Sequence, residues 1–115
     1  MRALSAQQIL RIWEVGQHQH PVDRGLLMLS SAFPDKRLED LAALPIGMRD
    51  AYLLTLREAT IGTVLDGFTE CPRCRERLEF QLNVGDLRII DPTQPLVMEH
   101  RFQTEGFEIW FRVPN

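Results

Sequence analysis

The amino-acid sequence predicts a single α+β domain, helical in residues 1–62 and β in residues 63–115. Apolar residues recur with a helical period up to Gly62 and alternate with a period of two after it. Turn signals divide the second half into two hairpins. A chain of 115 residues fits one domain, and 44% hydrophobic with 25% charged residues is ordinary globular composition.

Signals for three or four helices occupy the first half of the chain. Ser5 and Gln8 form a capping box, and the helix that they open ends near Gly16. Pro21 suits the first turn of a second helix, which Pro34 ends. We expect both helices to turn apolar stripes inward, made by Ala6, Ile9, Leu10 and Trp13 in the first and by Val22, Leu26, Leu29 and Phe33 in the second.

A short helical turn at residues 38–43 and a longer helix at residues 48–60, closed by Gly62, complete the helical half. The longer helix has an expected inward face and a charged stripe opposite to it. The inward face consists of Met48, Tyr52, Thr55 and Ala59, and the stripe contains Arg49, Asp50 and Arg57.

Two leucines of the longer helix, Leu53 and Leu54, fall within that charged stripe. The helix is therefore apolar nearly all round, and such a helix is either buried on both sides or held against a partner. In so small a domain we favour the partner. We predict Leu53, Leu54 and Arg57 as partner-binding residues.

Two β-hairpins are predicted in the second half. Leu78, Phe80, Leu82 and Val84 alternate with polar residues as in a half-buried strand, and residues 63–70 are the partner strand. Residues 98–103 and 107–113 flank the turn Thr104-Glu105-Gly106 and form the second hairpin. Since a strand seldom ends a natural chain as abruptly as this one does, we expect a continuation beyond Asn115.

Cys71 and Cys74, at the tip of the first hairpin, form the one motif with a chemical mechanism. Two thiolates at this spacing are half of a tetrahedral zinc site. The missing ligands are expected from a histidine (His18, His20 or His100), from a second subunit, or from residues beyond Asn115. Zinc knuckles favour Gly after the second cysteine for its positive φ, whereas this chain has Arg75. Bound zinc and a vestigial pair that merely closes a turn both stay open as interpretations.

A redox dithiol is a third interpretation of the cysteine pair. Redox cysteines lie at helix N-termini, where the dipole lowers the thiol pKa, but the residues after Cys74 are strand-like. His18 and His20 fit exposed linker residues better than metal ligands, because no carboxylates accompany them. Trp13 and Trp110 are expected in the core or a subunit interface, because no basic groove accompanies them.

Composition and motifs argue against several classes of function. The net charge is −3 and the arginines are interleaved with acids, which disfavours binding to nucleic acid. No segment has the length of a membrane span or the pattern of a signal peptide, so we expect no membrane contact and a cytoplasmic, bacterial protein. No nucleophile has a His and acid set around it and no Gly-rich phosphate loop occurs, so we expect no enzyme.

Three segments together resemble a known family. They are residues 49–62, the Cys-Pro-Arg-Cys that follows after eight residues, and the alternating residues 77–87; residues 23–29 are similar to the family's earlier helix. The chain resembles the T-even-type phage baseplate proteins (baseplate hub assembly chaperones), relatives of which occur in gene clusters for extracellular contractile injection systems. Arg75 departs from the Gly that is common after the second cysteine.

The resemblance implies a non-enzymatic role in building the baseplate of a contractile tail. The expected protein is an assembly factor or a minor component of the particle that binds the baseplate hub, other tail proteins or a second copy of itself. The alternative is a zinc-knuckle regulatory module that contacts nucleic acid, and the acidic balance speaks against it.

Overall fold

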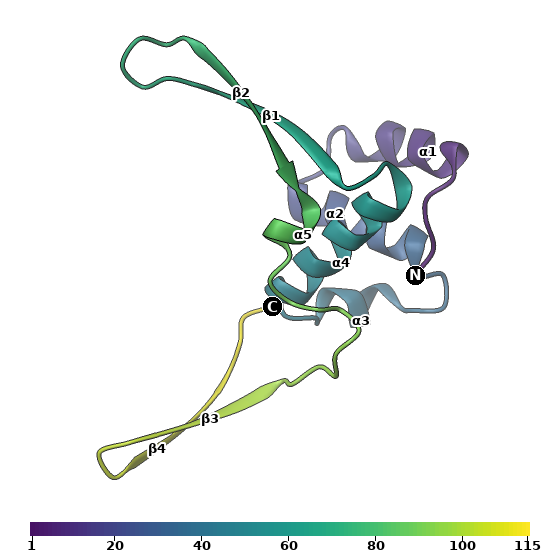
Figure 1. Cartoon of the computed structure of the whole chain (residues 1–115). Coiled ribbons are helices and arrows are strands. Elements are labelled where there is room, and N and C mark those ends of the chain that lie inside the picture. Colours follow the sequence, from purple (N-terminus) through teal and green to yellow (C-terminus); the bar gives the residue numbers. More distant parts are fainter.

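The computed structural model describes residues 1–115 and has a helical body from which two β-hairpins project (Figure 1). The body contains α1 (Ala6–Gly16), α2 (Pro21–Ala32), α3 (Leu38–Ala42) and α4 (Ile46–Thr60). The capping box of α1 is present, because the backbone N–H of Gln8 donates to the Ser5 hydroxyl and the backbone N–H of Ser5 donates to the Gln8 side chain. Pro21 opens α2 as predicted, and α4 begins directly after Pro45.

The β half consists of two antiparallel hairpins separated by a short helix and a linker. Strand β1 (Val64–Glu70) pairs with β2 (Arg77–Asn83), and β3 (Glu99–Thr104) pairs with β4 (Phe107–Arg112). Glu105 and Gly106 both have positive φ, 44° and 83°, as a two-residue turn of the hairpin-forming type requires. The one-turn helix α5 (Val84–Leu87) was not predicted; Asn83 caps it by accepting a hydrogen bond from the backbone N–H of Gly85.

The hydrophobic core lies inside the helical body. Only ten of 115 residues are buried, so the core is small for the length of the chain. Leu29 of α2 and Leu41 of α3 are completely buried, as is Val84 of α5. An edge-to-face contact between Phe33 and Tyr52, with ring centroids 5.0 Å apart, joins the end of α2 to α4. None of the helices is long and apolar enough to cross a membrane.

The projecting hairpins make the molecule extended. Its radius of gyration is 17.6 Å, and its extents are 52 × 45 × 26 Å. A compact domain of this size has a radius of gyration of about 13 Å. The excess comes from the two hairpins, whose tips point away from each other and from the body (Figure 1).

Helix α4 anchors the base of the first hairpin and the end of the second. The Arg57 guanidinium donates hydrogen bonds of 3.0 Å to the carbonyls of Gly62 and Val64, where β1 begins. After β2, Arg88 donates to Glu58 at 2.7 Å. At the other end of α4, the N–H of Ile46 donates to the carbonyl of Pro114, which follows β4, at 2.9 Å.

The expected buried faces are wrong in whole or in part in four elements, α1, β2, α4 and α2. In α1 the buried residues are Ile12 and Gly16, whereas Ile9, Leu10 and Trp13 of the predicted inward face are exposed. The reason is that α1 meets α2 along a narrow line of i, i+4 positions, where Gln8 also donates to the Ser31 carbonyl.

Strand β2 was expected to be half-buried, but all of its residues are exposed because no second layer covers the hairpin. In α4, Met48 is buried and Tyr52 and Thr55 are half-buried as predicted, but Ala59 is exposed and the remaining buried positions are Ala51 and Leu56. In α2, Leu29 is buried as predicted, while Val22 at the first turn is exposed.

Candidate protein-binding interface

The first hairpin has one apolar face and one polar face. Cross-strand pairing places Leu65 opposite Leu82, Gly67 opposite Phe80 and Thr69 opposite Leu78, and these six residues share one side of the ribbon. The Phe80 ring lies over Gly67, where an added Cβ would be 2.6 Å from the ring. Leu78, Phe80 and Leu82 are exposed, so this apolar face is uncovered.

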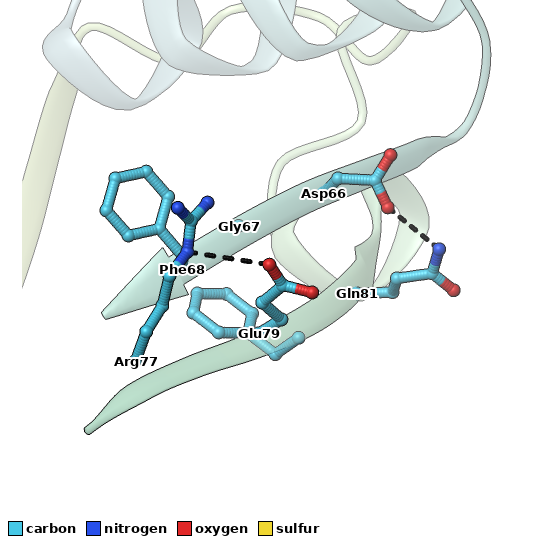
Figure 2. A pocket seen from close by; sticks show the side chains of 7 residues that line it. Asp66, Gly67, Phe68, Arg77, Glu79 and Gln81 are labelled. Atoms are coloured by element: carbon cyan, nitrogen blue, oxygen red, sulfur yellow. Dashed lines mark hydrogen bonds and ion pairs between the residues drawn. The ribbon is translucent and has the colours of Figure 1, made fainter. Parts of the chain in front are cut away.

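The opposite side of the first hairpin is held together by polar side chains (Figure 2). Gln81 donates a 2.8 Å hydrogen bond to Asp66, and Arg77 lies 3.4 Å from Glu79. The Arg77 guanidinium also stacks over the Phe68 ring, 4.3 Å from its centroid. A partly open depression of about 580 Å³ is lined mostly by residues of this side, with Gly67 and Phe80 from the other side, so its lining is mixed. We therefore regard the apolar side as the better candidate for binding.

The second hairpin repeats this division into two faces. Its apolar side carries residues that alternate with the polar ones: His100, Phe102, Thr104, Phe107, Ile109 and Phe111. Phe107 is 73% exposed and Phe102 is 55% exposed, although both are phenylalanines of a paired strand. On the polar side, an ion pair of 2.7 Å joins Arg101 to Glu108.

A third apolar surface is a groove of about 530 Å³ between α1, α2 and α4. Ile9 and Ile12 line it from α1, Met28 lines it from α2, and Leu53 and Leu56 line it from α4. Its lining is mainly apolar, and the exposed Ile61 extends it at the end of α4. Such a groove can accept an apolar side chain of a partner.

The structure places the three predicted partner-binding residues in different surroundings. Leu53 is half-buried in the groove and packs near Gly25 of α2. Leu54 is half-buried on another side of α4, in a depression shared with Leu87 and Ile90. Arg57 lines the groove, and its guanidinium is occupied by the hydrogen bonds to Gly62 and Val64. The structure therefore brings Leu53 and Arg57 together and separates Leu54 from them.

The cysteine pair lies at the tip of the first hairpin, as predicted. Both thiols are free, with Cys71 half-buried and Cys74 exposed. Backbone N–H groups of Cys74 and Arg73, together with the Cys74 side chain, donate to the Cys71 sulfur and lower the pKa of its thiol below the ordinary value. Arg75 has φ 59°, the left-handed conformation that a zinc knuckle requires after its second cysteine.

None of the three histidines completes a metal site with these cysteines. No group of three or more His, Cys, Asp or Glu residues is arranged to hold a metal ion within one chain. The Nδ1 atom of His20 accepts from the N–H of Val22 and caps α2. His100 stacks on Phe111 in the other hairpin. The pair can therefore supply half of a site only.

The two tryptophans are on the surface. Trp13 of α1 is 66% exposed and Trp110 of β4 is 64% exposed, so of the two expected places, the core or a subunit interface, the core is wrong for both. An aromatic ring of this size on the surface is typical of a protein interface. Sequence reasoning did not find the uncovered hairpin faces, although the alternation of apolar and polar residues in β2 was a signal for one of them.

Large uncovered apolar faces on projecting hairpins are features of proteins that assemble with others. The family comparison agrees with this class: residues 27–115 match the model of the T4 bacteriophage base plate protein family. The match covers well over half of the chain, and the chain belongs to this family. No curated protein and no solved structure matches it significantly. Membership indicates a structural or assembly role in a phage-type baseplate, in contact with other baseplate or tail proteins.

Proposed function

We propose that the protein is a non-enzymatic assembly factor or minor structural component of a contractile-tail baseplate, and that it binds the hub or other tail proteins through the apolar faces of its two hairpins. The observation that carries this proposal is the uncovered apolar side of each ribbon. A two-stranded hairpin is only marginally stable alone, so a partner surface that covers the ribbon would stabilise it.

The gain from such binding is large enough to matter. Burying one Phe, Leu or Ile side chain contributes roughly 1.5–3 kcal/mol. Phe102, Phe107 and Ile109 alone would therefore offset much of the cost of association, which is at least about 4 kcal/mol. The hairpins project from the body, so a partner can reach both sides of each ribbon (Figure 1).

Charge supports a protein partner over nucleic acid. The net charge is −3, the arginines of the first hairpin are interleaved with acids, and Arg77 pairs with Glu79. Binding to a phosphate backbone requires a clustered excess of Lys and Arg. The proposed site of action is the bacterial cytoplasm, where tails are assembled, and the protein either leaves the particle or remains in its baseplate. We extend the proposal to extracellular contractile injection systems, because the resemblance set out from the sequence includes relatives in gene clusters for such systems.

The test is co-purification with tail proteins expressed together with this chain. The variant Phe102→Asp with Ile109→Asp places two charges on the apolar side of the second hairpin and should lose the retained tail protein. The matched control is Gln103→Glu, on the polar side of the same hairpin, which should keep it. Retention of every tail protein by the Phe102→Asp, Ile109→Asp variant would refute binding through this face.

A further inference from the structure

The hairpin tip has the backbone of a metal-binding knuckle. The N–H of Cys71 donates to the carbonyl of Glu76 at 2.9 Å, and the N–H of Arg75 donates to the carbonyl of Cys71 at 2.8 Å. These bonds close a tight loop in which Arg75 adopts φ 59°. A residue with a side chain enters this conformation at a steric cost. Backbone N–H groups of Arg73 and Cys74 and the Cys74 side chain donate to the Cys71 sulfur, so the loop holds the two sulfurs close together.

A second ligand pair must come from outside the chain. The tip is the part of the first hairpin farthest from the helical body (Figure 1). His18 and His20 lie in the connector between α1 and α2, and His100 lies on the other hairpin. No third His, Cys, Asp or Glu is arranged with the cysteine pair to hold a metal ion.

A second copy of this chain has the chemistry to complete the site. Its own tip offers two more thiolates, and four thiolates in a tetrahedron are a common zinc site. A zinc ion with four thiolates carries a net negative charge, and Arg73 of each copy lies between the two ligands in the sequence and offsets part of it.

The charges around the tip also permit two copies to approach. Acidic and basic residues are equal in number from position 70 to 79: Glu70, Glu76 and Glu79 against Arg73, Arg75 and Arg77. The tip therefore has no net charge, and two copies meet no net electrostatic repulsion when they approach. The apolar side of the same hairpin, with Leu78 and Phe80, is continuous with the tip and would be partly covered by the same pairing.

We propose that two copies of this chain join at their hairpin tips around one zinc ion that is held by Cys71 and Cys74 of both copies. On binding, the four thiols release their protons to solvent and the metal is bound by sulfur alone. The site does not depend on the baseplate role, because the purified chain should bind zinc without any tail protein. Failure of one proposal is therefore separate from failure of the other.

The experiment measures zinc content and mass on the full chain, purified with reductant and without chelator. We expect about one zinc ion per two chains and a dimer. Removing zinc with a chelator should give monomers, and adding zinc back should restore dimers. Cobalt in place of zinc should show the intense absorption of a tetrahedral site with four thiolates.

The variant Cys74→Ser should lose zinc and the dimer and keep the helical circular dichroism, because the tip is remote from the core. His100→Ala is the matched control and should keep both. One zinc ion per monomer, less than about a tenth of an equivalent of zinc, or a disulfide-linked dimer without metal would each overturn the proposal. So would zinc that binds only when another tail protein is added. If Cys74→Ser does not fold, the change between dimer and monomer when zinc is removed from the unaltered chain still tests the proposal.

Discussion

The guanidinium of Arg88 lies 2.7 Å from the carboxylate of Glu58, and this contact fastens the segment after the first hairpin to α4. Arg88 also donates to the Thr55 hydroxyl at 3.0 Å. Together with Arg57, which holds the start of β1, these side chains make α4 the base on which the first hairpin stands. The position of the proposed binding faces therefore depends on one helix.

Glu58→Gln should lower the free energy of unfolding by about 1 kcal/mol, because it weakens a partly exposed ion pair with ordered geometry. The measurement is urea denaturation followed by circular dichroism. Glu39→Gln is the control, since the Arg37–Glu39 pair is largely exposed and its loss should change stability by less than about 0.5 kcal/mol. Equal effects of the two substitutions would contradict the anchoring role of Glu58.

Gly62 connects α4 to β1 with φ 125°, and no side chain lies within 4 Å of where its Cβ would be. Gly62→Ala should therefore lower the free energy of unfolding by about 1 kcal/mol or more through backbone strain alone. Gly25→Ala is a contrast, because Gly25 lies inside α2 and an added Cβ would meet Leu53 at 3.4 Å, an ordinary contact. That change should be neutral or stabilising by up to about 1 kcal/mol. A stabilising Gly62→Ala would mean that the connection differs from this structure.

Substitutions at Leu53 and Leu54 should have different effects, the first on partner binding in the groove and the second on the stability of the fold. Leu53→Ser should leave the chain folded and weaken co-purification with tail proteins, because Leu53 lines the open groove. Leu54→Ser should cost about 1–2 kcal/mol of stability, because Leu54 packs beside Leu87 and Ile90, and should keep binding. Thermal unfolding and co-purification on both variants make the comparison. Loss of binding with Leu54→Ser alone would reverse the assignment.

Arg75→Gly tests the geometry of the hairpin tip. Glycine enters the left-handed conformation of Arg75 without steric cost, so the zinc-binding shape should become easier to reach. We expect the dissociation constant for zinc to fall by up to about tenfold, which corresponds to about 1.4 kcal/mol. A competition titration with a coloured chelator measures it, with Arg73→Gly as the control that should not tighten binding. Weaker zinc binding by Arg75→Gly would show that the Arg75 side chain has a role of its own.

Local signals were enough to predict most of the secondary structure. Ser5, Pro21 and Pro34 set helix boundaries through bonds and clashes with their immediate neighbours, and the turn at Gly106 follows from the same kind of rule. The helix α5 was missed because Val84 continues the alternation of β2, which hid the capping role of Asn83. The period of the apolar residues shows that a segment has one apolar and one polar face. A period of two, interrupted by turn residues, correctly identified both hairpins.

Burial could not be predicted in the same way. Trp13 and Phe80 lie on apolar faces, yet whether a face is covered depends on how many layers the chain can build. With four strands in two separate ribbons, no second layer exists, and the faces stay open. The place of Cys71 and Cys74 at the tip of the first hairpin could be predicted, because the two residues are close in sequence. The different surroundings of Leu53 and Leu54 could not, because they depend on where α2 and α5 pack against α4.

Amide hydrogen exchange shows whether the hairpin faces become covered when the protein binds another baseplate protein. Exchange is compared between the isolated chain and its purified complex with the tail protein that it retains. We predict slower exchange in residues 64–83, in residues 99–112 or in both on complex formation, because a covering partner would suppress opening of these marginal ribbons. Unchanged exchange in both hairpins, with protection confined to the helical body, would show that the partner binds the helical body and leaves the hairpin faces uncovered.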